Sequence, residues 1–275
     1  MQALVVLINA QELAGLSKEQ RQAAIDRTVQ PLQRPRHHAL DDGQAETPTA
    51  PAAAPQRPVE QVSDGDARLR QRVLPVPPPL AELLPDGGLP IGVIRYVGSA
   101  GPVLGITAAV TAAGLPVVWC GVPQLNSHAV HEMSGDLGRL YFVPDPGSEP
   151  ARVVEILVEG FPLVLSGPAG MDVPPSRSRA ILARARESGC SLIMAGGPRW
   201  EGTGLDIQAT LTKAEGLRQG AGRVRSLSFA VRARSKAGLR VGEIAHRPGP
   251  GESVEWVRQS TQDIAPVLER EASGA

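Results

Sequence analysis

The stretch IGVIRYVGSAGPVLGITAAVTAAG, residues 91–114, decides the fold class of this chain. Its apolar run at 93–97 predicts a buried strand, the glycines that follow predict a tight turn, and residues 104–114 predict a helix that ends at Gly114. A strand, a glycine-rich turn and a helix form the layout of a phosphate-binding loop. The first question is therefore whether the residues that bind phosphate are present.

The turn lacks the side chains that a working phosphate loop requires. The pattern G-x-x-x-x-G-K-[ST] supplies backbone N–H groups and a lysine to the phosphates and a hydroxyl group to magnesium. Counted from Gly98, the last three positions of this pattern fall on Val103, Leu104 and Gly105. An apolar side chain at 104 cannot donate to an oxyanion, and placing it against phosphate costs desolvation. We interpret the turn as a degenerate loop that serves chain reversal and holds no cofactor, with Gly98, Gly101, Gly105 and Thr107 as its remnants.

Two further parts of an ATPase centre are missing from the ends of the expected strands. The strand at 162–166 ends in Ser166, where a carboxylate would orient magnesium. After the strand at 116–121, Pro123 and Gln124 stand where an acid would activate the attacking water, and the first acid is Glu132. The sequence therefore predicts no catalytic residue, no metal site and no enzymatic reaction. A DNA-dependent ATPase of the RecA type is the weaker alternative.

Outward from the opening stretch, apolar strands alternate with helices. This alternation predicts a doubly wound, mainly parallel α/β sheet whose two faces are both covered by helices. From Leu205 onward, apolar and polar residues alternate with a period of two, which predicts an antiparallel C-terminal extension at the sheet edge. The expected strands lie at 93–97, 116–121, 139–143, 162–166 and 190–195, and the expected helices at 104–114, 127–135, 149–160 and 175–189.

Composition divides the chain into four parts. Residues 1–32 form an apolar and then helical N-terminal segment, and residues 33–66 are too poor in large apolar groups to offset their ordering entropy, so we expect a flexible linker there. Residues 67–258 form the α/β core, and residues 259–275 form a C-terminal tail.

Overall charge and cysteine usage exclude several classes of protein. The formal net charge is +0 and the pI is about 7.0, so any nucleic-acid contact has to come from a local patch. Cys120 and Cys190 lie in apolar runs without metal-ligand spacing, which indicates reduced core thiols. No apolar run approaches the roughly 20 residues that span a membrane. We expect a cytoplasmic protein with no membrane contact.

The loops after the fourth and fifth expected strands are the first candidates for binding. They offer Arg177 and Arg179 in one case, and Arg199 beside Trp200 in the other. An exposed tryptophan next to an arginine can stack on a base and contact phosphate. The alternative, slightly favoured, is that Trp200 packs under its own glycine-rich loop.

A basic stretch at 213–240 is the second candidate, and it contains a lone acid, Glu215. Strand periodicity predicts that Phe229 and Val231 point one way while the arginines at 232 and 234 point the other. The stretch suits phosphates, an acidic partner, or a solvated edge whose charges prevent strand aggregation, and these three interpretations stay open. The arginines proposed to bind DNA or a partner here are Arg223, Arg225, Arg232 and Arg234.

Three further features of the sequence are candidates for binding. The C-terminal segment offers a compact apolar set for a protein partner, although the same residues can instead cover the core. The N-terminal segment is a second candidate for docking on another subunit. A zinc site at His128 and His131 is the weaker interpretation, because no third ligand is near in sequence. The C-terminal residues predicted to bind a partner are Trp256, Ile264, Val267 and Leu268.

The order of these elements over residues 73–257 resembles the RecA core. The passages that carry a closer similarity are LPVPPPLAELLPDGGLPIG at 74–92, LGRLYFVPDPG at 137–147, GPRWEGTGLD at 197–206 and GAGRVRSLSFAVRAR at 220–234. On these passages the chain is identified as a member of the RecA-like ImuA family, in its actinobacterial ImuA-prime branch of mutasome proteins. It departs from RecA where catalysis takes place, so RecA's own chemistry does not carry over.

The resemblance implies a non-catalytic accessory role in DNA repair and mutagenesis during the DNA-damage (SOS) response. Such proteins bind ImuB, an inactive relative of Y-family polymerases, and support translesion synthesis by an error-prone C-family polymerase. The resemblance therefore implies these protein partners, leaves direct DNA contact open, and implies association with the nucleoid during damage. A SulA-like inhibitor of cell division is a further alternative, because that protein descends from the same core.

Overall fold

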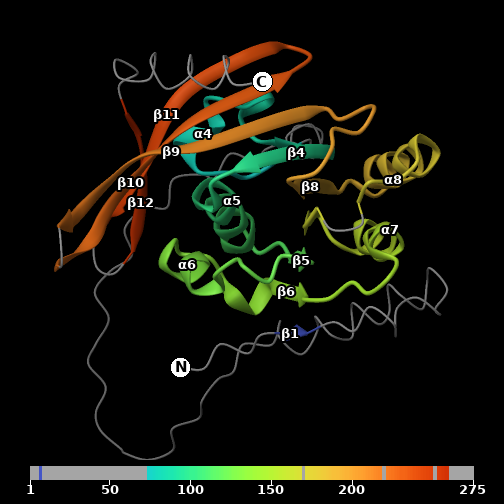
Figure 1. Cartoon of the computed structure of the whole chain (residues 1–275), viewed down its shortest axis with the longest axis horizontal. Coiled ribbons are helices and arrows are strands. Elements are labelled where there is room, and N and C mark those ends of the chain that lie inside the picture. The colour runs from blue at the N-terminus through green and yellow to red at the C-terminus, as the bar shows by residue number, and fades with distance from the viewer. Residues whose placement is uncertain (1–5, 8–72, 169–170, 219–220, 250–252, 260–275) are drawn as a thin grey trace, which may run out of the picture.

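The computed structural model describes residues 6–7, 73–168, 171–218, 221–249 and 253–259, and these form one continuous ten-stranded sheet with helices packed on it (Figure 1). The strand order is β1-β6-β5-β7-β8-β4-β9-β10-β11-β12. A short lead-in of β2 (Val73–Leu74), α4 (Pro78–Ala81), a 3-10 turn (Pro85–Gly87) and β3 (Leu89–Pro90) precedes the core. The expected linker at 33–66 lies outside the described residues, as does all of the 259–275 tail except Gln259.

Five parallel strands form the centre of the sheet. They are β4 (Gly92–Gly98), β5 (Val117–Cys120), β6 (Leu140–Val143), β7 (Leu163–Ser166) and β8 (Ser191–Ala195). They pair in parallel as β6-β5-β7-β8-β4, and β1 (Val6–Leu7) adds a parallel edge strand beside β6. The helices cross between them, so the predicted fold class, a doubly wound and mainly parallel α/β sheet with an antiparallel C-terminal extension, is confirmed.

Four helices cover the two faces of this parallel region. Helices α5 (Ala100–Ala112) and α6 (Ser127–Glu132) pack on one face, while α7 (Pro150–Gly160) and α8 (Pro175–Ser188) pack on the other. Alternate residues of each strand belong to opposite cores: Val93 packs with α7 and α8, while Ile94 packs with α5. Burial on both faces explains why these strands are apolar throughout. No helix among the described segments is long and apolar enough to cross a membrane.

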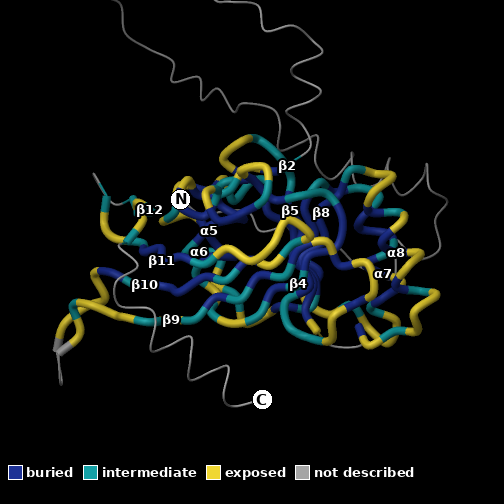
Figure 2. Tube along the Cα trace, turned by 90° about the horizontal axis from the view of Figure 1, so that it is seen from above, coloured by how far each residue is buried: buried dark blue, intermediate teal, exposed yellow. Residues whose placement is uncertain are grey.

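The antiparallel extension is longer than the sequence predicts. Strands β9 (Leu205–Arg218), β10 (Ala221–Ser235), β11 (Gly238–Pro248) and β12 (Val254–Gln259) continue the sheet beyond β4. The start of β9 pairs in parallel with β4, and the following strands pair antiparallel. Figure 2 shows that the far ends of β9 and β10 leave the body of the molecule as an exposed ribbon.

The start of helix α5 is wrong in the sequence-based prediction, and this difference changes the site. Helix α5 begins at Ala100 rather than at residue 104, so Ser99 is the single residue between it and β4. The prediction assigned the stretch before residue 104 to a glycine-rich turn, and that stretch includes Pro102. In the first helical turn, however, proline is tolerated, since the missing N–H has no partner within the helix there.

Candidate functional site

The turn between β4 and α5 is closed by hydrogen bonds within the chain. Gly98 has a φ of +111°, and a Cβ atom there would lie 2.0 Å from the carbonyl oxygen of Ala209. The backbone N–H of Ser99 donates to that same oxygen at 2.8 Å, and its Oγ accepts from the N–H of Leu211 at 3.0 Å. The carbonyl of Ser99 accepts from the hydroxyl of Tyr96. Strand β9 therefore lies against the turn where a phosphate loop would stay open for its ligand.

Aromatic side chains fill the space above the start of α5. Phe229 of β10 is 2 % exposed, and a Cβ atom at Gly101 would approach its Cζ to 2.4 Å. One turn further along α5, a Cβ atom at Gly105 would approach the ring of Trp256 to 2.6 Å. The two glycines therefore admit rings from β10 and β12. At residue 102 the helix has a proline, so its first turn also lacks one of the N–H donors that would face an anion.

The hydroxyl groups near this turn are committed to core contacts. Thr107 is buried, donates to the carbonyl of Val103 at 3.1 Å, and accepts from Nε1 of Trp119 at 3.3 Å. Ser166, at the end of β7, is buried and donates to the carbonyl of Gly167. Burial raises the pKa of the Tyr96 hydroxyl, so it stays a neutral donor to the turn. The arrangement stabilises a packed junction between strand, turn and helix.

The loops after β7 and β8 are joined by Trp200. Its ring is 7 % exposed and packs in the core on the α7–α8 face, while its Nε1 donates to the carbonyl of Met171 at 3.1 Å. The structure therefore favours the interpretation in which Trp200 packs under its own loop, and the alternative of an exposed base-stacking ring is wrong. Arg199, the preceding residue, is exposed.

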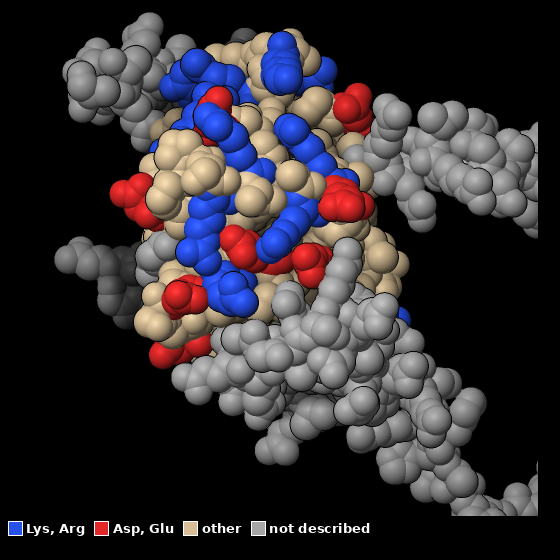
Figure 3. All heavy atoms as spheres, turned by 90° about the vertical axis from the view of Figure 1, so that its right-hand side faces the viewer, with Lys and Arg blue, Asp and Glu red and all other residues tan. Residues whose placement is uncertain are grey.

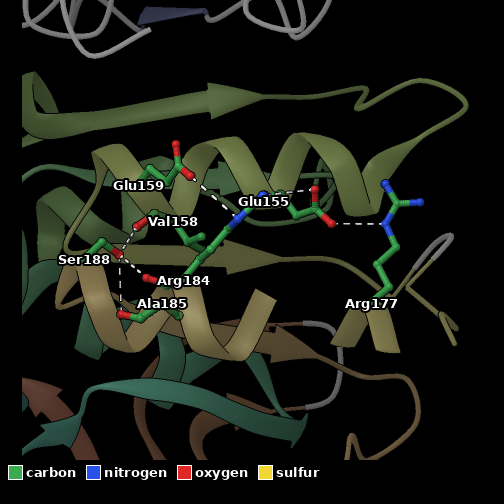
Figure 4. Close-up of polar contacts among 7 residues, drawn as sticks. All are labelled: Glu155, Val158, Glu159, Arg177, Arg184, Ala185 and Ser188. Carbon is green, nitrogen blue, oxygen red and sulfur yellow. Dashed lines mark hydrogen bonds and ion pairs between the residues drawn. The ribbon is translucent and has the colours of Figure 1, made fainter. Parts of the chain in front are cut away.

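Carboxylates lie beside the arginines of α8. Arg177 donates through Nε to Glu155 of α7 at 3.2 Å, and Arg184 donates to the same carboxylate at 3.1 Å (Figure 4). Arg179 makes two hydrogen bonds to one oxygen of Glu201, at 3.2 and 2.8 Å. Positive and negative side chains are consequently interspersed over this side of the molecule (Figure 3). Arg177 and Arg179 have their charge balanced within the chain, which weakens their case as a phosphate site.

The four arginines predicted on β10 fall into two separate pairs. Arg223 and Arg225 are exposed near the far end of the β9–β10 hairpin, whereas Arg232 is half-buried and Arg234 exposed near its base. Nine residues of strand separate Arg223 from Arg232, which is about 30 Å at the usual rise per residue. The predicted alternation is confirmed, because Phe229 and Val231 belong to the core on the α5 face. Strand β10 therefore does not present one continuous basic stripe.

The C-terminal apolar set is described only in part. Trp256 is half-buried against Phe229 and His246, with ring centroids 6.2 and 5.4 Å apart. Its Nε1 is buried and finds no hydrogen-bond partner among the residues that the structure describes. Trp256 thus packs on the core, the alternative that the sequence left open. The predicted partner-binding residues Ile264, Val267 and Leu268 lie outside the described residues.

Two features of the structure could not be predicted from the sequence. Phe229 follows the expected alternation, but no sequence signal indicates that its ring reaches Gly101, because the contact joins elements more than 100 residues apart. The second is apolar exposure on the hairpin, where Leu211, Leu217 and Val224 are 46, 58 and 47 % exposed. The length of the apolar–polar alternation indicates a hairpin, but the sequence does not indicate where the neighbouring strands of the sheet end beside it.

The histidines on α6 remain a surface pair. His128 and His131 are exposed, with ring centroids 6.2 Å apart, and Nε2 of His128 lies 3.7 Å from Glu132. Within the described ranges, no group of three or more His, Cys, Asp or Glu side chains converges on a possible metal position. The structure therefore supplies no third ligand beside this pair.

Comparison with known proteins places the α/β core in a family. Residues 82–202 match the model of the MT3502 N-terminal domain. The uncharacterized protein Rv3395c of Mycobacterium tuberculosis is 37 % identical over 146 residues, which cover 52 % of this chain and 71 % of that protein. Among solved structures, one ATPase domain aligns with 73 % of this chain and 100 % of its own length, at a TM-score of 0.43 and 11 % identity.

Proposed function

Because the chain belongs to the same family as the M. tuberculosis protein Rv3395c, we propose that it is a RecA-like accessory factor of the ImuA-prime type. In this role it supports damage-induced translesion DNA synthesis and mutagenesis without a reaction of its own. It binds an ImuB-type inactive relative of Y-family polymerases, and through that partner it serves an error-prone C-family polymerase. It acts in the cytoplasm and joins the nucleoid when DNA is damaged.

The observation that carries this proposal is the closed turn at the start of α5. Phosphate binding there needs open backbone N–H groups and space for three oxygens. The chain instead places the ring of Phe229 against Gly101, a proline at 102 and the carbonyl of Ala209 on Ser99. These contacts support a role for the turn as a packed structural junction, which fits a protein without a reaction of its own. They argue against the ATPase alternative because a nucleotide would have to displace a buried ring.

Binding of nucleotide is tested on the purified chain. We expect no shift in melting temperature with Mg-ATP and no hydrolysis of radiolabelled ATP above background, with or without single-stranded DNA. A ligand at 100 times its dissociation constant stabilises a protein by about 2.7 kcal/mol, which such a melting experiment detects readily. Hydrolysis that is stimulated by DNA and lost on altering residues 98–107 would establish a RecA-type ATPase instead.

The biological role is tested in cells that lack the gene. We expect damage-induced mutation frequency to fall, and to recover when the wild-type chain is supplied. A tagged chain recovered from damaged cells is expected to bring down the ImuB-type protein. Recovery of the cell-division GTPase in its place would indicate a SulA-like inhibitor.

A further inference from the structure

The far end of the β9–β10 hairpin is the part of the described surface that packing within the chain leaves unexplained. Pairing between β4 and β9 ends at Ala209, and pairing between β10 and β11 begins at Leu227. Residues 215–218 and 221–226 therefore form the far end of the hairpin and project beyond both neighbouring strands, whereas residues 211–214, which pair with residues 227–229 of β10, extend past the end of β4 (Figures 1 and 2). We name residues 211–218 and 221–226 the hairpin ribbon.

The hairpin ribbon concentrates the exposed apolar side chains of the molecule. Four large apolar side chains are strongly exposed in the described part of the chain, and three of them, Leu211, Leu217 and Val224, lie on this ribbon. The fourth, Leu239, lies at the start of β11. Single exposed leucines are ordinary on protein surfaces, but three large exposed apolar side chains on one hairpin indicate an interaction site.

The ribbon also has a surplus of positive charge. Lys213 lies 2.6 Å from Glu215, so this acid is already balanced on the ribbon itself. Arg223 and Arg225 are exposed and form no ion pair with any described residue, in contrast to Arg177 and Arg179 on α8. An occupant of this surface therefore has to supply both apolar side chains and carboxylates.

We propose that the hairpin ribbon is the docking surface for an acidic, apolar segment of the protein partner. The inference deepens the proposed function and rests on it, because it assigns a surface to the partner named there. A bare phosphate backbone matches the arginines but leaves Leu217 and Val224 without a role. A protein segment whose apolar residues alternate with Asp or Glu matches both features, since it buries the former and pairs with the latter.

The test uses the purified chain and the ImuB-type protein of the same organism, with affinity measured by biolayer interferometry. We expect Leu217→Asp and Arg225→Glu each to weaken binding at least about tenfold. Arg225→Lys keeps the charge and is expected to stay within about threefold of wild type. Two matched controls, Leu239→Asp and Arg152→Glu, place the same changes on exposed residues outside the ribbon and are expected to leave affinity within about twofold.

The outcomes separate this inference from the proposed function. Circular dichroism and urea midpoints equal to wild type show that the ribbon variants are folded, as expected for exposed positions. If Leu217→Asp and Arg225→Glu both bind the partner as tightly as the wild-type chain, the inference is overturned and the proposed function stands. If the wild-type chain does not bind the ImuB-type protein, both the inference and the proposed function are overturned. Variants that bind the partner normally but lose affinity for a labelled single-stranded oligonucleotide would reassign the ribbon to nucleic acid and overturn the inference as well.

Discussion

At the scale of single residues, the contact between Gly101 and Phe229 decides whether the start of α5 is open or filled. A Cβ atom at 101 would lie 2.4 Å from the ring, which is too close for unshifted packing. Glycine at this position is therefore a packing requirement of the aromatic ring. In a phosphate loop, glycine lets the backbone come close to the ligand. At residue 101 glycine is required for a different reason, because it leaves room for the ring of Phe229.

Gly101→Ala is expected to lower the free energy of unfolding by about 1–3 kcal/mol, as overpacking in a dense core does. Alanine inside a helix ordinarily gains up to about 1 kcal/mol over glycine, so a loss reports the clash with Phe229. Urea denaturation measures the change. Gly204→Ala is the control, because the nearest atom to a Cβ there is 4.0 Å away and the backbone is not left-handed. If Gly101→Ala is as stable as wild type, the start of α5 is not packed as described.

The buried thiols give a second prediction at this scale. Burial raises the pKa of Cys120 from its ordinary value of 9.0 to about 12, and it raises that of Cys190 as well. The thiolate is the reactive form, so neither cysteine is expected to react with iodoacetamide at pH 8 in the folded chain, by mass spectrometry. Both should react in urea.

The stability of the fold follows the same shift in pKa. Between pH 9 and 12 the unfolded chain releases the Cys120 proton while the folded chain keeps it, so the free energy of unfolding falls as pH rises through this range. Urea midpoints across the alkaline range measure the fall, and a Cys120→Ala variant is expected to lose part of it. In the iodoacetamide experiment, rapid labelling of Cys120 or Cys190 in the folded chain at pH 8 would contradict the burial of these thiols.

At the scale of elements, one carboxylate of α7 binds two arginines of α8. Glu155 has a side chain that is 14 % exposed and accepts from both Arg177 and Arg184. Glu155→Gln removes the charge that two arginines share, and we expect a loss of about 1–3 kcal/mol in the free energy of unfolding. Glu201→Gln changes an exposed pair with Arg179 and is expected to cost less than about 1 kcal/mol. Equal effects from the two substitutions would show that burial does not distinguish these ion pairs.

The elements of the fold were largely predictable because periodicity follows burial. The mainly apolar run at 162–166 predicts a strand covered on both faces, and the structure has β7 at Leu163–Ser166. The start of α5 was predicted too late because the glycines after β4 were interpreted as turn residues, whereas Gly101 and Pro102 lie in the first helical turn. The ring above Gly101 and the burial of Trp200 depend on which distant elements meet, and local pattern does not record that.

At the scale of the whole molecule, one sheet separates two cores. Trp119 belongs to the core beneath α5 and α6, and Trp200 belongs to the core beneath α7 and α8. Adjacent residues of the same strands feed both cores, so neither can be lost while the strands remain paired. The molecule should therefore behave as one cooperative unit.

Single-tryptophan variants test this cooperativity. With Trp119 or Trp200 as the remaining fluorophore, we expect urea transitions that coincide in midpoint once each variant is compared with its own far-ultraviolet circular dichroism. A fluorescence midpoint that precedes the dichroism midpoint in one variant would show that its face of the sheet unfolds independently.

The single-residue junction between β4 and α5 also determines what it would take to build a phosphate site at this turn. With Ser99 as the only link, residue 104 lies within the helix and is 7 % exposed, so exchanging its leucine for lysine would strand a cation in hydrocarbon. Room for an anion at this turn would require additional residues between β4 and α5, and it would also require the removal of the ring of Phe229 on β10. Each single substitution toward such a site is therefore expected to lower the stability of the folded chain.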